Sequence, residues 1–248
     1  MILITNDDGI HSPGIQALWD ALKSFGEIIV VAPKSQKSAV SHAITISEPL
    51  RVKKIDKING FSGFSVSGTP ADCTKIAVKS ILNEKPKVLI SGINLGANVG
   101  NNIFYSGTVS AALEGTMLGI PSIAISLDSF ETDSFDLSKK IAKKVVEFVL
   151  KNSLPIGTML NVNVPNITLK KFSGIKITKQ GKQFFNDDFD QRFDPRGQIY
   201  YWMKGEIVDN DQDTIFDGRA ISDGYASITP LRFDITDESY ISDLKEKF

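Results

Sequence analysis

Two adjacent carboxylates, Asp7 and Asp8, follow a short apolar run at the start of the chain and precede Gly9. Such a run is typical of a buried strand, so both acids are predicted at its carboxyl end. Carboxylates held within about 4 Å repel by about 1 kcal/mol in water and several-fold more in a partly dry cleft. A divalent cation would offset this repulsion, because hard cations prefer oxygen ligands. The alternative is that one acid only caps the next helix.

A second segment, residues 91–108, could bind an anion. Its first twelve residues include three glycines and four asparagines, so the backbone there can approach a ligand closely. Ser106, Gly107 and Thr108 then stand directly before a predicted helix, whose free N–H groups and positive dipole end would favour a phosphate. The alternative is that Thr108 is only a helix cap and that the small residues only form turns.

Alternating strands and helices would bring these two segments together. We predict strands at the N-terminus and over residues 27–33, 88–91 and 122–127, with helices over residues 15–25, 71–82 and 108–118. This order predicts an α/β fold with a doubly wound, mostly parallel sheet. Ligands bind such sheets outside the carboxyl ends of the strands. The acidic pair, the loop with Ser35, Ser38 and Ser41, and Asn94 should therefore converge.

The remaining segments are predicted to add further elements to this core. Alternating segments at residues 43–46, 50–55 and 64–67 predict a small antiparallel excursion. Later segments predict a helix over residues 135–150 and strands over 159–164, 175–179 and 199–203, while residues 184–196 mix aromatic and charged side chains. We expect residues 1–130 to form the core with the metal and phosphate site. Residues 131–248 should complete it and add a β-rich extension, with a projecting arm at about 180–203 and a terminal helix.

The composition excludes several classes of function. The chain has 248 residues, of which 42% are hydrophobic and 23% charged, as in ordinary globular proteins. Its formal net charge of −1 provides no overall field for nucleic acid or an anionic membrane, so neither partner is expected. The single cysteine, Cys73, excludes an internal disulfide and a zinc cluster of several thiolates. With no signal peptide or membrane span in the sequence, we expect a cytoplasmic protein.

Four other polar residues admit both a functional and an ordinary interpretation. His11 and His42 are the only histidines, which excludes an all-histidine catalytic zinc site. Either could act as an acid or base, or lie in a loop with no chemical role. Lys34 and Lys37 could steer a phosphate towards the site, or could only form a solvated loop face.

Several short motifs, in their order along the chain, resemble those of the SurE family, the stationary-phase survival proteins that act as 5′-nucleotidases. The motifs lie at residues 5–9, 31–33, 68–73, 91–94, 105–108 and 223–230. The similarity runs from residue 1 to about residue 233. It implies a Rossmann-like core, a divalent cation, and hydrolysis of nucleoside 5′-monophosphates to nucleoside and phosphate.

The resemblance also assigns roles to residues of this chain. It implies one divalent cation per subunit, Mg or Mn, held by Asp7, Asp8, Ser38 and Asn94. It implies a substrate phosphate pocket made by Asn94, Asn98, Ser106, Gly107 and Thr108. Lys34 stands where the family often has an acid, which weakens the assignment of this loop. The arm and the helix near residues 238–248 would join subunits into a homodimer or homotetramer, although the arm could equally be a folded-back surface loop.

Other proteins with acids after a first strand fit less well. Haloacid dehalogenase-like phosphatases need acids two residues apart, whereas Asp7 and Asp8 are adjacent. LmbE-like deacetylases need a His-Pro before the acidic pair, where this chain has Thr5 and Asn6. A non-enzymatic receiver-like signalling domain would need an aspartate after a later strand. The expected activity is metal-assisted phosphomonoester hydrolysis, with 3′-nucleotides or short polyphosphate as alternative substrates and with Asp7 or Asp8 as a possible general base.

Overall fold

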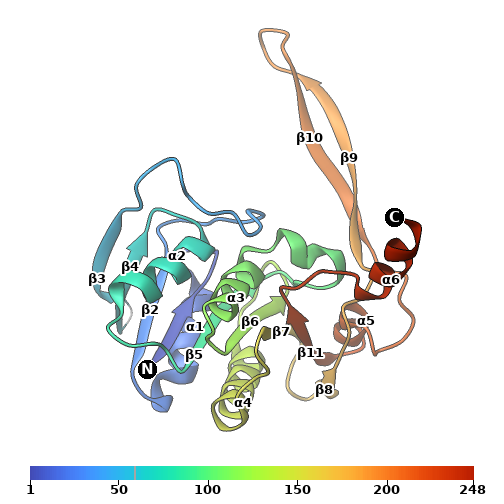
Figure 1. The fold of residues 1–248 in the computed structure, drawn as a ribbon. Coiled ribbons are helices and arrows are strands. Elements are labelled where there is room, and N and C mark those ends of the chain that lie inside the picture. Colours follow the sequence, from blue (N-terminus) through green and yellow to red (C-terminus); the bar gives the residue numbers. More distant parts are fainter. Residues whose placement is uncertain (59) are drawn as a thin grey trace.

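One large sheet with helices on both faces forms the body of the protein (Figure 1). The structure is a computed structural model that describes residues 1–58 and 60–248. Within these residues the sheet has nine strands in the order β3-β4-β2-β1-β5-β6-β7-β11-β8. The β3–β4 and β7–β11 pairs are antiparallel and the others are parallel. The predicted α/β fold with a mostly parallel sheet is confirmed.

The bounds of the elements are as follows. The sheet contains β1 (Ile2–Thr5), β2 (Ile28–Pro33), β3 (Val52–Ile58), β4 (Phe61–Val66), β5 (Val88–Leu95), β6 (Ser122–Asp128), β7 (Thr158–Pro165), β8 (Gly174–Ile177) and β11 (Tyr225–Arg232). The α-helices are α1 (Pro13–Leu22), α2 (Pro70–Ile76), α3 (Gly107–Met117), α4 (Asp136–Asn152), α5 (Asp217–Ser222) and α6 (Glu238–Lys247). Short 3₁₀ turns occupy Lys23–Phe25 and Gly100–Tyr105, and a π-helical turn occupies Ala77–Ile81. In the described part of the chain, no helix has the length and apolarity needed to cross a membrane.

The centre of the sheet is buried on both faces, which explains its nearly continuous apolar strands. β1 pairs in parallel with β2 on one side and with β5 on the other. Its side chains alternate between two apolar layers: Ile2 and Ile4 belong to the layer that also includes side chains of α1 and α4. Leu3 belongs to the opposite layer, with side chains of α2 and α3. The carboxyl end of β1 is therefore fixed from both sides.

Helix α1 starts close to the site because its first turn packs against β5. Ser12 is its N-cap and accepts a hydrogen bond from the Ile15 N–H. The interpretation that Asp7 or Asp8 caps this helix is therefore wrong. A Cβ atom on Gly14 would lie 1.9 Å from the carbonyl oxygen of Ile93, so only glycine allows the helix to approach this closely.

Some predicted boundaries differ from the structure. Residues 43–46 are not a strand, because this segment makes polar contacts with α2 and its N-cap instead of pairing with the sheet. β5 runs to Leu95, beyond the predicted end at Ser91, because Gly92 and Asn94 still pair with β6. The helix predicted over residues 71–82 is α2 followed by the π-helical turn. Two elements that were not predicted as such, α5 and β11, complete the far side of the sheet.

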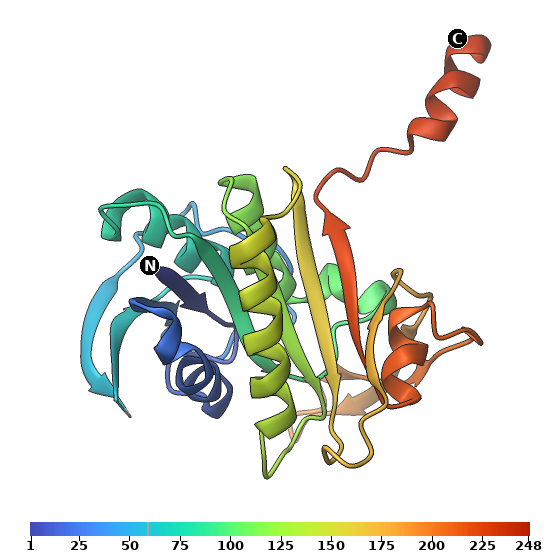
Figure 2. The ribbon, with the colours of Figure 1, turned by 90° about the horizontal axis from the view of Figure 1, so that it is seen from below.

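A long hairpin projects from the body, as Figure 1 shows. It consists of β9 (Phe184–Phe193) and β10 (Ile199–Val208), which pair antiparallel along their whole length. β10 is longer than the predicted strand over residues 199–203 because each residue up to Val208 finds a partner in β9. The hairpin exposes large apolar side chains, among them Phe189, Trp202 and Met203. Helix α6 ends an extended C-terminal segment and points away from the body in Figure 2.

The single thiol of the chain lies inside the fold. Cys73 on α2 is fully buried in the same apolar layer as Leu3 and Leu89. Burial raises the pKa of its thiol well above the usual value, and the neighbouring charge of Asp72 acts in the same direction. Cys73 is therefore a protonated core residue.

We expect Gly14→Ala to lower the free energy of unfolding by about 3 kcal/mol, because the new methyl group must displace backbone rather than a flexible side chain. Urea unfolding followed by circular dichroism measures this change. Asp20→Ala on the same helix is the control, since it removes only an exposed ion pair with Lys23 and should cost less than about 0.5 kcal/mol. Equal unfolding midpoints for the two variants would contradict the close packing of α1 on β5.

Candidate active site

Asp7 lies at the junction between the end of β1 and the start of α3. Its side chain is almost entirely buried, and its Oδ1 accepts a hydrogen bond of 2.5 Å from the Thr108 hydroxyl. The main-chain N–H of Thr108 also favours the ionised form of this carboxylate. A Cβ atom on Gly107 would lie 2.9 Å from the Cβ of Asp7, so glycine is needed for the helix to come this near. The first turn of α3 therefore holds Asp7 directly.

Asp8 points to the end of β5 instead. Its carboxylate accepts a hydrogen bond from the main-chain N–H of Leu95, the residue after Asn94. The buried side chain of Asn94 donates from Nδ2 to the carbonyl oxygen of Gly96 at 2.7 Å. This bond uses the amide nitrogen, so the Oδ1 of Asn94 is available as an acceptor. The structure thus brings Asp7, Asp8 and Asn94 to one edge of the sheet.

The two acids are electrostatically uncompensated. Burial raises the pKa of Asp7 to about 6, and the nearby charge of Asp8 adds to this effect, while the Thr108 hydrogen bond opposes it. Burial also raises the pKa of Asp8. Within residues 1–58 and 60–248, no group of three His, Cys, Asp or Glu side chains could hold a metal ion. The possible ligands at this edge are the two carboxylates and nearby uncharged oxygen atoms. This donor set fits a hard divalent cation that keeps water or phosphate ligands.

Ser38 lies on an exposed loop that crosses the same region. Its hydroxyl accepts a hydrogen bond from the side-chain amide of Gln36 at 2.8 Å. The N–H of the preceding residue, Lys37, donates to the carbonyl oxygen of Asp7 at 2.7 Å. The structure therefore places the backbone beside Ser38 against the acidic pair, whereas the Ser38 side chain itself stays open to solvent.

The two hydroxyl groups at the start of α3 have different roles, one in capping the helix and one in binding Asp7. Ser106 is the N-cap, because its hydroxyl accepts a hydrogen bond from the Val109 N–H at 3.1 Å. The interpretation of Thr108 as only a cap is therefore wrong. The Thr108 hydroxyl is directed to Asp7. The first turn of α3 therefore joins the acidic pair to an 11-residue helix, whose positive end faces the same edge of the sheet.

Asn98 is held by a buried network that the sequence interpretation missed. Its main-chain N–H donates to the side-chain oxygen of Asn163 at 2.8 Å, and its carbonyl oxygen accepts from the side-chain amides of Asn161 and Asn163. Its own Nδ2 donates to the Ser126 hydroxyl at 2.8 Å. An alternation of asparagine with apolar residues in β7 was the available signal, because period two places both asparagines on one face.

A second missed residue, Asp217, ties the loop before α3 to the base of the hairpin. Its buried carboxylate accepts hydrogen bonds from the main-chain N–H groups of Gly100, Gly181 and Gly218. Burial nevertheless raises the pKa of this carboxyl above its usual value. No local motif marks this role, because its partners lie up to 117 positions away in the chain.

Comparisons with known proteins identify the family of this chain. A family model described as "Survival protein SurE" matches residues 2–187. The chain belongs to the SurE family. A Thermosipho melanesiensis protein named 5′-nucleotidase SurE is 46% identical over 247 residues, covering 100% of this chain and 97% of that protein. A Heliobacterium modesticaldum protein of the same name is 44% identical over 246 residues, covering 99% and 90%. The crystal structure of the SurE protein from Aquifex aeolicus has a TM-score of 0.86 at 42% identity, covering 99% of this chain and 98% of that one.

A cleft of about 410 Å³ opens beside the acidic pair of this SurE-family chain. Asp8, Gly9, His11, Lys34 and Ser35 are among its lining residues. His11 therefore shares this cleft with Asp8, whereas His42 bonds to Glu114 on α3. The two histidines that the sequence left undecided thus have separate surroundings.

We expect Asp7→Asn to raise the free energy of unfolding of the metal-free SurE-family protein by about 2 kcal/mol at neutral pH. An acid with a raised folded pKa destabilises the fold once pH exceeds its unfolded pKa, here 3.8, and the full penalty is present above about 6. The gain should therefore vanish near pH 4. Urea unfolding in EDTA at several pH values measures it, and a variant less stable than the wild type at neutral pH would contradict an uncompensated Asp7.

Proposed function

We propose that this protein is a metal-dependent 5′-nucleotidase that hydrolyses nucleoside 5′-monophosphates to nucleoside and phosphate. The observation that supports it most is the convergence of two buried or half-buried acids, an amide oxygen and the positive end of α3 at one edge of the sheet. Two relatives at 44–46% identity over nearly the whole chain carry the name 5′-nucleotidase SurE.

Asp7, Asp8, Ser38 and Asn94 would hold one divalent cation, Mg or Mn. When bound, the cation would neutralise the acidic pair, polarise a phosphoryl group and lower the pKa of a coordinated water. The raised pKa of Asp7 supports this assignment, because a buried acid beside another acid lacks a compensating positive charge.

The chain's own residues supply orientation and proton transfer. In this proposal the N–H groups at the start of α3, with Ser106 and Gly107, bind the substrate phosphate. Thr108 fixes the orientation of Asp7 through the hydrogen bond to Oδ1. Asn98, held by the network from β7, presents its remaining amide hydrogen to the phosphate. Asp7 or Asp8 accepts the proton of the attacking water as general base.

We also infer a cytoplasmic homodimer or homotetramer. The buried free thiol of Cys73 fits a reducing compartment. The hairpin and α6 expose aromatic and aliphatic side chains away from the body, and such surfaces mark protein contacts. Residues 131–248 would supply this arm and helix to the assembly.

Phosphate release from a panel of 5′- and 3′-nucleotides and a short polyphosphate tests the activity. We expect release from 5′-monophosphates with Mg or Mn, loss of release in EDTA, and recovery when the cation is added back. Asp8→Asn should lower kcat by at least about 100-fold, because it removes a charged group from the reacting edge. Release that persists in EDTA, or preference for polyphosphate, would argue against the proposal.

Thr108→Val tests the role of the hydrogen bond to Asp7. The valine keeps the shape but removes a bond that lowers the pKa of Asp7. The acid should then protonate at higher pH and compete better with the cation, so at a fixed, subsaturating cation concentration the acidic limb of the kcat/KM profile should move to higher pH. Ser110→Ala on the same helix is the control, since its hydroxyl donates to the Ser106 carbonyl oxygen rather than to Asp7. An unmoved limb with a lower plateau would show that Thr108 acts elsewhere.

A further inference from the structure

The loop of residues 34–46 is held along its length by bonds to distant parts of the chain. Near its start, the Lys37 N–H bonds to Asp7. Farther on, the Ser41 N–H and hydroxyl donate to the carbonyl oxygens of Tyr105 and Phe104 at 3.0 and 2.7 Å. Only residues 38–40 lie between these two attachments, so the position of Ser38 depends on both.

The same stretch has an unfavourable backbone conformation. Ala39 and Ser41 have φ values of 54° and 52°, in the left-handed region that side chains with a Cβ atom seldom adopt. Such strain persists only where surrounding contacts fix the chain. The loop must therefore have strong attachments just beyond Ser41.

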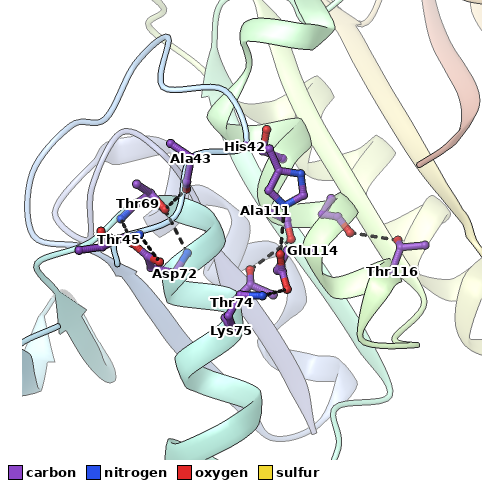
Figure 3. A network of polar contacts seen from close by, with 12 residues as sticks. His42, Ala43, Thr45, Thr69, Asp72, Thr74, Lys75, Ala111, Glu114 and Thr116 are labelled. Carbon is purple, nitrogen blue, oxygen red and sulfur yellow. Dashed lines mark hydrogen bonds and ion pairs between the residues drawn. The ribbon is translucent and has the colours of Figure 1, made fainter. Parts of the chain in front are cut away.

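Figure 3 shows that these attachments are two acids on helices α2 and α3. The His42 ring donates from Nε2 to Oε2 of Glu114 at 3.0 Å, and Lys75 bonds to the other oxygen at 2.7 Å. The Glu114 side chain is only 6% exposed. The hydrogen bond from His42, followed by Lys75, holds the pKa of Glu114 below its usual value, so this carboxyl is ionised and accepts charge-assisted bonds.

The second attachment lies three residues farther along. The Thr45 hydroxyl donates to Oδ2 of Asp72 at 2.6 Å, and its N–H donates to the same carboxylate. Thr69 caps α2 and donates to the Ala43 carbonyl oxygen at 2.7 Å. The helix cap and the loop thus share Asp72, which explains why residues 43–46 lie against α2 rather than pairing with the sheet.

We propose that Glu114, acting through His42, is a positioning residue that holds the 34–46 loop in place so that Ser38 stays beside the acidic pair. Glu114 does not touch substrate in this arrangement. Glu114 holds the end of the strained stretch that follows Ser41, whereas the Lys37 N–H holds the end nearest Asp7. The inference rests on the proposed function for the role of Ser38, but the attachment of the loop can be measured without a cation.

Limited trypsin digestion of the metal-free protein measures the attachment. His42→Ala should raise the rate of cleavage after Lys34 and Lys37 by about fivefold, because the loop must leave its bonds before a protease can bind it. His42→Gln retains an N–H donor for Glu114 and should restore slow cleavage. Glu147→Gln is the matched control, since it removes only an exposed pair with Lys151 on α4. Cleavage of His42→Ala at the wild-type rate would overturn the proposal.

Calorimetric titration with Mn²⁺ alone measures the consequence for the site. His42→Ala and Ser38→Ala should both weaken binding by about tenfold, and His42→Gln should recover most of the affinity. If His42→Ala loosens the loop but Ser38→Ala binds Mn²⁺ like the wild type, Ser38 is not a ligand. That result overturns the positioning role together with this part of the proposed function. Unchanged cleavage overturns the positioning role but leaves the proposed function intact.

Thr45→Val provides an independent variant. It keeps the volume of the side chain and removes the hydroxyl bond to Asp72. We expect faster cleavage after Lys37 and weaker Mn²⁺ binding, both in the direction of His42→Ala, with the cooperative unfolding transition retained because Thr45 is only half-buried. If both His42→Ala and Thr45→Val are cleaved at the wild-type rate, the loop does not depend on these helices.

Discussion

The burial of Asp7 between the end of β1 and the first turn of α3 is the constraint on which the site depends. A carboxylate in this position loses hydration, and hydrogen bonds from Thr108 and from the main-chain N–H of Asp7 compensate part of the loss. The surrounding fold must therefore be rigid enough to keep the acid there. β1 lies between two other parallel strands and two apolar layers, which provide that rigidity.

The other parts of the site are likewise fixed by hydrogen bonds between residues that are far apart in the sequence. Asn98 depends on two asparagines of β7, and the loop at Gly100 depends on Asp217. None of these partners is near in sequence. A buried polar group without a partner is costly, so each bond both satisfies a donor and fixes a loop. The site is thus held by side chains that need not contact the substrate.

The fold and the convergence of Asp7, Asp8 and Asn94 could be predicted from the sequence because they follow from regular patterns. Apolar runs and stripes identify strands and helices, and a parallel sheet brings the ends of its strands together. Contacts between side chains that are far apart in the sequence could be identified only in the structure. The sequence allows Thr108 to be a helix cap, whereas in the structure its hydroxyl donates to Asp7. Residues 43–46 alternate like a strand, although they bond to α2. Such pairings between distant residues leave no local pattern.

The buried thiol of Cys73 has a practical consequence. Iodoacetamide reacts with thiolates, and this sulfur is both protonated and shielded by the sheet beneath α2. Its alkylation requires α2 to detach from α3 and β2, against which this helix packs. The chain therefore contains a natural chemical probe for the opening of its central layer, and it needs no engineered label.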